Sequence, residues 1–386
     1  MRGTGWKNWK RFKNGETLVL ILHADDIGMC EEANLAVIPY LVNQQIQSAS
    51  VMMPCEYSDA FMQWFKANEE YDIGLHLTLT SEWETWRWST VAEEEDVPGL
   101  LDGDEFMWPS AAEVVQNARP EEVEKEIRAQ IQKAFSLGVK PTHVDTHMGT
   151  LYASNAFSKV YMDIAEEYQI PARVIDLSND AMVQKLKELG YPVTDDLIAV
   201  SNNYAMPKLD DFGAVPGGTS YEEVRAQFFE QVQSLNSGIT EITFHPSVKS
   251  DNLKEITDSW QQRVWEAQLF SDPEVINFLE KEEIIFTTWK ELMKRYFSYV
   301  NKDDETCNDN MPCYPTIQDA IDAATSRKTI KITLGSYDEN LALHSSKILS
   351  LGGGWDFAFT TQSSNTSINS LTISSGVVTI DSIVIQ

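Results

Sequence analysis

Two adjacent acids follow a short apolar run near the start of the sequence. Leu18 to Leu22 form a wholly apolar stretch typical of a strand that is buried on both faces of a parallel sheet, and the run HADDIG at residues 23–28 comes directly after it. Asp25 and Asp26 cannot share a buried strand end without a cation or a proton between them. Ligands of α/β proteins collect outside the carboxyl ends of the strands. The stretch therefore predicts a metal site or a catalytic site.

Histidines occur where further strands are expected to end. Those at a strand end or beside an acid are His23, His76, His143, His147 and His245. The run HVDTH at 143–147 places two imidazoles four residues apart, so that on a strand both face the same pocket. Imidazole and carboxylate together suit Zn²⁺, Fe²⁺ or Ni²⁺, and they tolerate Mg²⁺ when several waters remain. With Asp26 and His76, this motif offers a site of one aspartate and two histidines that keeps a position open for water.

The elements that must position these residues alternate between two kinds of pattern. Short apolar runs with strand-like composition recur along the chain, and segments of helical period lie between them. The runs cover residues 48–54, 72–79, 141–147, 172–175, 238–246 and 283–289. This alternation predicts a parallel sheet or barrel, whose strand ends converge on one face. Residues 80–110 interrupt it and predict a long loop that is functional or mobile.

Several of these stretches carry a family resemblance. The matching segments are HADDIG at 23–28, SASVMMP at 48–54, GLHLTLT at 74–80, LLDGDEF at 100–106, KPTHVDTH at 140–147 and EITFHPS at 241–247. In this order, and over most of residues 17–298, the sequence resembles the YdjC family of carbohydrate deacetylases. The resemblance implies an α/β fold, a distorted (β/α) barrel of the polysaccharide-deacetylase type.

The resemblance also implies roles for the residues at the strand ends. Asp26, His76 and His147 would bind one divalent metal ion, Mg²⁺ or Zn²⁺. Asp25 would be the general base, and His245 a candidate for the acid or polarising group. The chemistry agrees, because hydrolysis of an amide needs an activated water and stabilisation of the charge on oxygen, both of which a metal supplies. An adjacent aspartate takes the proton of the water, and an imidazolium protonates the departing amine.

Further residues are candidates for support of these groups. We expect His143 and Asp145 to contact the metal ligands or the base without binding the metal, and so to orient a ligand or the base. Arg173 ends the next strand and either orients the acids or lies at the surface. Many family members continue the HVDTH motif with more histidines, whereas here Met148-Gly149-Thr150 follows. This departure leaves the ligand set intact but changes the substrate pocket beyond it.

The tryptophans of residues 80–110 allow two interpretations. Indole rings stack on the flat faces of sugars, and Trp86 and Trp88 are the better candidates for such contacts. Aromatic residues of long loops more often anchor the loop to the rest of the domain, and we favour anchoring here.

Charge and hydropathy exclude several classes of partner. A net charge of −29 argues against nucleic acid or an anionic membrane surface as the main partner. No run of 18 apolar residues exists, so no insertion into a membrane is expected. Residues 1–16 are basic and lack both an apolar leader and a cleavage site, which predicts a cytoplasmic protein. A homodimer remains open.

Composition changes beyond Asn301, where Ser, Thr, Gly and Asn become frequent. We expect a first domain at 1–300, a linker at 301–313 and a second domain at 314–386. Short β-like runs recur in the tail at intervals of roughly 14 to 20 residues, a spacing compatible with a small all-β parallel solenoid. YPTIQDAIDAA and GGGWD resemble the start of the right-handed parallel β-helix of pectin-lyase-like proteins, which keeps an extracellular location open.

Two further features of the tail are informative. The last run stops on an apolar strand without a polar cap, so we expect further coils. Cys307 and Cys313 bracket a short polar loop and could close a small disulfide in an oxidising compartment.

The function expected from these patterns is that of a metal-dependent hydrolase, which removes N-acetyl groups from an amino-sugar oligosaccharide or a glycoconjugate. One alternative is a non-catalytic glycan-binding module on the same fold, against which the intact set of acids and histidines argues. Another keeps the metal barrel but changes the chemistry to a different amide hydrolysis or to a sugar isomerisation.

Overall fold

The computed structural model describes residues 18–282, 284–308, 310–324 and 328–386. The basic N-terminal segment, residues 1–16, in which we expected no leader sequence, lies outside the residues that the structure describes. The chain divides into two compact units. The first extends to Trp289 apart from Ala205–Pro207, and the second consists of those three residues and Lys290–Gln386. None of the helices in the described ranges combines the length and apolarity needed to cross a membrane.

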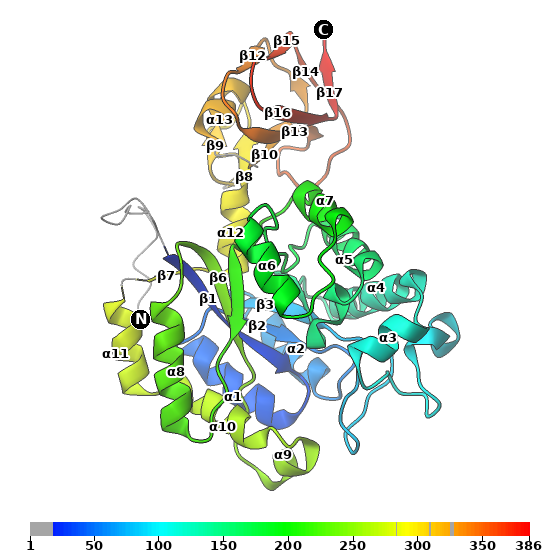
Figure 1. Cartoon of the computed structure of the whole chain (residues 1–386). Helices are drawn as coiled ribbons and strands as arrows, with labels where there is room; N and C mark the ends of the chain where they lie inside the picture. The colour runs from blue at the N-terminus through cyan, green and yellow to red at the C-terminus, as the bar shows by residue number, and fades with distance from the viewer. Residues whose placement is uncertain (1–17, 283, 309, 325–327) are drawn as a thin grey trace. The chain divides into compact units, whose positions relative to one another are not determined.

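A seven-stranded parallel sheet forms the centre of the first unit (Figure 1). Its order is β4-β3-β2-β1-β6-β5, with β7 also paired to β1. The strands are β1 (Leu18–Ile27), β2 (Ser48–Val51), β3 (Asp72–Leu77), β4 (Val144–Thr146), β5 (Asp211–Ala214), β6 (Gly238–Phe244) and β7 (Ile285–Phe286). The run Val19–Leu22 is fully buried, as expected of a strand covered on both faces.

Helices surround these strands in Figure 1. They are α1 (Glu31–Val42), α2 (Ser58–Lys66), α3 (Ala111–Asn117), α4 (Pro120–Ser136), α5 (Asn155–Tyr168), α6 (Asp180–Glu188), α7 (Asp195–Asn203), α8 (Tyr221–Gln233), α9 (Asp251–Ile256), α10 (Trp260–Leu269) and α11 (Pro273–Lys281). Helix α12 (Trp289–Tyr296) begins at the last residue of the first unit and otherwise belongs to the second. Helix α4 begins at Pro120, as the sequence predicts, since proline suits a first helical position. Between the predicted strands at 238–246 and 283–289 the chain forms three short helices, α9 to α11.

The sheet has the form of a half barrel whose two edges are linked by an extended segment. Residues 172–175, a predicted strand, are not part of a named strand, but this segment bonds to edge strand β4 and to Leu209, two residues before edge strand β5. Arg173 N–H donates to the Val144 carbonyl at 2.8 Å, and Asp176 N–H donates to the Leu209 carbonyl at 2.8 Å. These bonds agree with the α/β fold expected of a deacetylase-type barrel.

The segment that interrupts the alternation, residues 80–110, we call the tryptophan loop. It contains only two short turns of 3₁₀ helix, at Glu94–Asp96 and Pro98–Leu100. Its ends are joined by the Ser81 N–H, which donates to the Trp108 carbonyl at 2.9 Å. The loop is therefore fixed at its base.

The second unit consists of parallel strands in three sheets, which the chain visits in a repeated order. The sheets are β16-β13-β10-β8-β9, β11-β14-β17 and β12-β15. Its elements are β8 (Phe297–Val300), β9 (Cys313–Tyr314), α13 (Ile317–Ala323), β10 (Lys328–Thr333), β11 (Gly335–Ser336), β12 (Asn340–Leu343), β13 (Ile348–Trp355), β14 (Thr366–Ile368), β15 (Ser370–Ile373), β16 (Val377–Asp381) and β17 (Ile383–Ile385). Strand β8 pairs with β10, so residues 297–300 lie in this unit and not in the first domain of 1–300.

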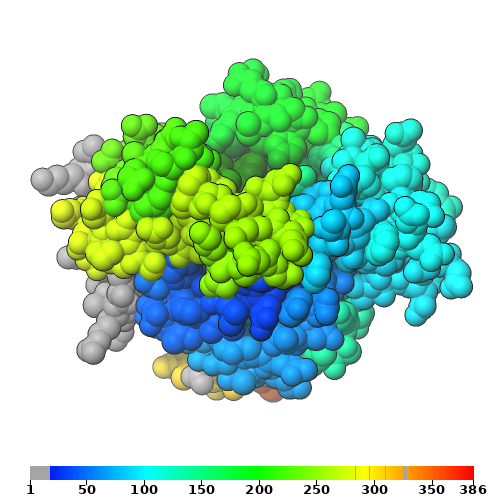
Figure 2. Space-filling view, turned by 90° about the horizontal axis from the view of Figure 1, so that it is seen from below, coloured from blue at the N-terminus to red at the C-terminus, as the bar shows by residue number. Residues whose placement is uncertain are grey.

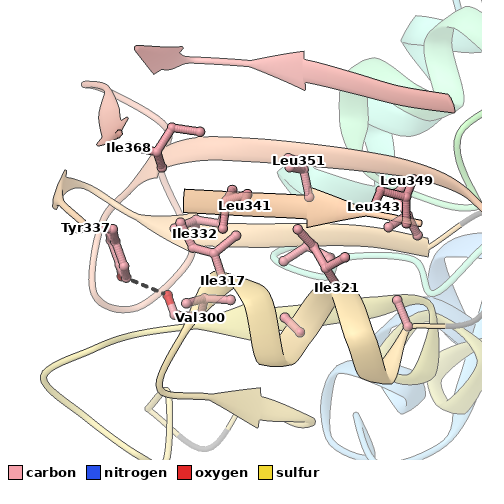
Figure 3. Packing of buried hydrophobic residues seen from close by; sticks show 13 residues of the cluster. Val300, Ile317, Ile321, Ile332, Tyr337, Leu341, Leu343, Leu349, Leu351 and Ile368 are labelled. Atoms are coloured by element: carbon pink, nitrogen blue, oxygen red, sulfur yellow. Dashed lines mark hydrogen bonds between the residues drawn. The ribbon is translucent and has the colours of Figure 1, made fainter. Parts of the chain in front are cut away.

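Apolar side chains from α13 and from the strands fill the interior of the second unit (Figure 3). Ile321 of α13 and Ile332, Leu341 and Leu351 of the strands are at most 1% exposed. Cys307 and Cys313 form a disulfide, as the sequence analysis allowed.

Candidate functional site

The end of β1 carries the two acids, and its backbone is irregular there. The register of β1 against β2 shifts between Ala24 and Ile27. Asp26 has a φ of 62°, in the left-handed region that costs a non-glycine residue on the order of 1 kcal/mol or more. Neighbouring residues of a regular strand point to opposite faces. Because of the irregular turn, both Asp25 and Asp26 line the same cavity.

Three buried residues from three strand ends meet at Asp26. Its Oδ1 lies 3.3 Å from His76 Nε2 and 3.2 Å from His147 Nδ1. All three residues are at most 3% exposed. Asp26 Oδ1 accepts no hydrogen bond of good geometry from the described residues. A buried carboxylate oxygen left in this way between two imidazole nitrogens fits a divalent cation, and the three ligand atoms lie within 4.8 Å of one another.

Each of these two imidazoles has a second carboxylate on its other nitrogen. His76 Nδ1 is 2.7 Å from Asp145 Oδ1, and His147 Nε2 is 3.1 Å from Glu82 Oε2. Burial lowers the pKa of His76, but Asp145 and Asp25 outweigh it and raise the pKa to about 9. In the same way Glu82 and Asp26 raise the pKa of His147 to about 10 against its burial. A metal that binds here must therefore displace protons.

Asp25 belongs to a buried network that Asp145 links to His76 of this group. Its Oδ1 is 3.1 Å from His23 Nε2, and its Oδ2 is 3.5 Å from Arg173 Nη2. Asp145 Oδ2 contacts the same two groups, at 3.0 Å from His23 Nε2 and 3.2 Å from Arg173 Nη2. Burial raises the pKa of Asp25, but Arg173 and His76 lower it to about 2. Asp25 is therefore ionised at neutral pH, as a base must be.

Arg173 is buried and does not lie at the surface, because a third acid holds it from behind. Glu241 Oε1 on β6 is 3.1 Å from Arg173 Nη1, and both side chains are at most 6% exposed. The Trp289 indole N–H donates to Glu241 Oε2 at 2.8 Å. Arg173 thus joins the acid at the end of β1 to an acid inside β6.

His143 does not face the cavity with His147, contrary to the expectation from the HVDTH spacing. Strand β4 covers only Val144–Thr146, and the chain turns into a short helical segment, His147–Tyr152, directly after it. His143 is fully buried, with its ring stacked on Trp289 at 5.5 Å and edge-on to His23 at 5.0 Å. Its place behind His23 is compatible with a supporting position.

His245 lies at the other side of the cavity and is partly accessible. Its side chain is 34% exposed, and Nδ1 is 3.6 Å from Glu266 Oε2. Burial lowers the pKa of His245, but Asp26 and Glu266 outweigh it and raise the pKa above its ordinary value. Arg263 of α10 completes this side, with Nη2 2.7 Å from Asp26 Oδ2.

A cavity of about 500 Å³ joins these groups. Asp25, Asp26, His147 and His245 line it. Figure 2 shows a hollow between the green surface near residue 200 and the yellow-green surface near residue 260, which supply other parts of its wall. Its size is that of a small-ligand site.

Trp86 and Trp88 do not line this cavity. Trp88 is 5% exposed, and its indole N–H donates to the Thr80 carbonyl at 2.8 Å. The Trp86 indole N–H donates to the Met29 carbonyl at 3.0 Å, and its ring stacks on Tyr57. Both indoles anchor the tryptophan loop, so neither is placed to stack on a sugar in the cavity.

Sequence reasoning missed four charged residues of the site. Glu241 carried a usable signal, because it is an acid inside an otherwise apolar strand, GITEITF. Arg263 and Glu266 are buried on α10, three residues apart, but an arginine and a glutamate on a helix usually lie at its surface. Glu82 carried no signal, because it stands in an aperiodic loop.

Comparison with known proteins agrees with this geometry. A model of the YdjC-like protein family matches residues 19–281. A carbohydrate deacetylase of Thermus thermophilus is 29% identical over 293 residues, 75% of this chain and 98% of the relative. One of Thermoanaerobacter pseudethanolicus is 26% identical, over 70% of this chain and 97% of the relative.

A solved structure supports the fold. It is that of an Enterococcus faecalis protein described as a cellobiose-phosphate cleavage protein, with a TM-score of 0.59 and 21% identity over 72% of this chain and 99% of that one. The family match spans all the strand ends that carry the acids and histidines of the cavity. On this evidence the chain belongs to the YdjC-like protein family.

Proposed function

We propose that this protein removes N-acetyl groups from amino-sugar oligosaccharides or glycoconjugates with the help of one divalent metal ion, Mg²⁺ or Zn²⁺. It is a hydrolase that acts on carbon–nitrogen bonds, as its carbohydrate deacetylase relatives are. The observation that carries the proposal is Asp26 Oδ1, buried between two imidazole nitrogens with Asp25 beside it in the same cavity.

Asp26, His76 and His147 would hold the metal. Bound there, the ion would supply an activated water and polarise the amide carbonyl. His76 and His147 would each present one nitrogen to it, since the other nitrogen of each ring is engaged by a carboxylate. Asp145 therefore serves to orient His76.

Asp25 accepts the proton of the attacking water. Its carboxylate is held by His23 and Arg173, which leaves it ionised and fixed beside the ligand Asp26. Arg173 orients Asp25 and Asp145 together. His143 supports the ring of His23 from behind.

His245 donates a proton to the departing amine. Its side chain is partly accessible at the cavity wall, so a substrate nitrogen has access to it. Glu266 and Asp26 favour the imidazolium form that such an acid needs. Asp25 and His245 thus line the same cavity, one as the base and the other as the acid.

For the second unit we propose a small parallel β-solenoid. The support is the repeated path of the chain: β10, β11 and β12 are followed by β13, β14 and β15, each stacked in parallel on its counterpart of the preceding coil. Strands β16 and β17 add to the first two sheets in the same way. For the whole protein we propose a cytoplasmic location. An extracellular location is the alternative, because the second unit resembles the β-helix of pectin-lyase-like proteins.

An assay of acetate release tests the function. N,N′-Diacetylchitobiose and longer N-acetylated oligomers are the substrates, with the metal-depleted chain and with the chain reloaded with Mg²⁺ or Zn²⁺. Release that depends on the metal supports the proposal. Binding of the sugars without release of acetate in any metal form contradicts it.

A further inference from the structure

Glu82 belongs to the tryptophan loop, and its carboxylate contacts the proposed metal ligand His147. It is the fifth residue after β3, whose last residue is Leu77. Its Oε1 and Oε2 lie 3.2 Å and 3.1 Å from His147 Nε2, and its side chain is 18% exposed. The contact joins an irregular loop to the buried end of β4.

The two nitrogens of His147 face two different carboxylates. Nδ1 is 3.2 Å from Asp26 Oδ1, whereas Nε2 faces Glu82. When a cation takes the lone pair of Nδ1, the hydrogen of the neutral imidazole lies on Nε2, where the Glu82 carboxylate, which only accepts hydrogen bonds, holds it. The lone pair of Nδ1 is then directed to the side of Asp26, where a cation would lie.

His76 shows the same arrangement with a carboxylate from another part of the fold. Its Nδ1 is 2.7 Å from Asp145 Oδ1, and its Nε2 is 3.3 Å from Asp26 Oδ1. Asp145 is fully buried on β4, while Glu82 belongs to a loop. One ligand is thus oriented by the sheet and the other by the tryptophan loop.

We propose that Glu82 is a positioning residue that fixes the ring of His147 for metal binding and couples the tryptophan loop to the metal site. This inference rests on the proposed metal-dependent function. A carboxylate partner makes the ligand imidazole a stronger donor and restricts its rotation. Loss of Glu82 lowers the affinity for the metal without removing any ligand.

The loop on either side of Glu82 is held by bonds that do not involve its side chain. Thr80 and Ser81 are fully buried. The Trp88 indole N–H donates to the Thr80 carbonyl, the Trp88 amide donates to Ser81 Oγ at 3.1 Å, and Ser81 N–H donates to the Trp108 carbonyl. A change of the Glu82 carboxyl group therefore leaves the base of the loop in place.

The test measures Zn²⁺ affinity of the full chain. Metal-depleted protein competes with a chromophoric zinc chelator, and the shift of the melting temperature on adding Zn²⁺ is recorded in parallel. The variants are Glu82→Ala, which removes the acceptor, and Glu82→Gln, which keeps an oxygen acceptor without the charge. Glu84→Gln is the matched control, because Glu84 is an exposed acid of the same loop.

We expect Glu82→Ala to weaken Zn²⁺ binding on the order of 10- to 100-fold. Glu82→Gln should lie between Glu82→Ala and the wild type, and Glu84→Gln should equal the wild type. Both Glu82 variants lose the ion pair with His147, so their metal-free melting temperatures should be lower than that of the wild type, and their additional stabilisation by Zn²⁺ should be smaller. A merely structural role would lower the metal-free melting temperature but leave the Zn²⁺ affinity of both variants equal to that of the wild type.

The outcomes separate this inference from the proposed function. Wild-type affinity in Glu82→Ala overturns the role of Glu82, even if the wild type releases acetate. A weakened affinity in Glu82→Ala with no acetate release by the wild type upholds the role of Glu82 and contradicts the deacetylase. A wild type that binds neither Zn²⁺ nor Mg²⁺ overturns both.

Discussion

Glu241 and Arg173 form an ion pair of 3.1 Å in which both side chains are buried, directly behind Asp25. Arg173 also contacts Asp145, so one guanidinium is shared by three acids from two strand ends and one strand interior. Burial raises the pKa of Glu241, and His23 and Arg173 act against it. The pair holds the proposed base in place through Arg173, which lines the cavity, whereas Glu241 does not.

Glu241→Gln tests the energetic weight of this pair. Gln keeps the size of the side chain but removes one partner of a buried ion pair, which typically costs about 3 kcal/mol or more of unfolding free energy. We expect that loss in urea denaturation, with a lower kcat because Arg173 is no longer fixed. The control is Glu230→Gln, an exposed acid of α8. Equal stability of the two variants would contradict the prediction.

Asp25→Asn separates metal binding from proton transfer. The amide keeps the shape of the side chain but cannot take a proton from water, and loss of a general base typically costs about 10²- to 10⁴-fold in rate. We expect kcat for acetate release to fall by that factor while the metal content, measured on the purified protein, is unchanged. Unchanged activity with bound metal would exclude Asp25 as the base.

The local sequence was sufficient to predict the part of the site whose residues lie at the ends of parallel strands. Asp26, His76 and His147 lie together because β1, β3 and β4 belong to one parallel sheet, whose carboxyl ends share an edge. An alternating βα pattern predicts that arrangement without any knowledge of side-chain contacts. The α/β class of the first unit follows from the same pattern.

The rest depends on backbone irregularities and on pairings between distant residues. His143 faces away from the cavity because β4 ends at Thr146. Asp26 has a left-handed backbone conformation, which the spacing of residues in the sequence does not predict. Glu82 meets His147 across 65 residues of sequence, from a loop without a period. Strand β8 looked like the end of the first domain, but its partner β10 lies about 30 residues further on.

Glu126 makes stability depend on pH at a position away from the proposed metal ligands. It is fully buried on α4, and its carboxyl oxygens accept the Val91 and Ala92 amides of the tryptophan loop at 3.0 Å and 2.8 Å. Burial outweighs these donors and raises the pKa of Glu126 from 4.5 to about 7. Between these values the folded chain holds a proton that the unfolded chain has released.

The unfolding free energy contributed by Glu126 therefore falls as the pH rises from 4.5 to 7. The difference amounts to about 3 kcal/mol over that window. Glu126→Gln does not titrate, so the stability of the wild type should decline relative to this variant as the pH rises, in urea titrations at a series of pH values. Glu121→Gln, at an exposed position of the same helix, should follow the wild type. A constant difference between wild type and Glu126→Gln would show that Glu126 stays ionised.

The disulfide between Cys307 and Cys313 restricts a short loop of the second unit. Cys307 is fully buried and packs with Phe297, Tyr299 and Phe359. Closing so short a loop removes entropy from the unfolded chain worth about 2 kcal/mol. We expect the double change of both cysteines to serine to lower the unfolding free energy of this unit by that amount, in calorimetry of the full chain. A reductant should destabilise the wild type and leave the variant unaffected, because Cys30 and Cys55 are free thiols and offer no bond to reduce. An equal effect of reductant on both proteins would contradict the prediction.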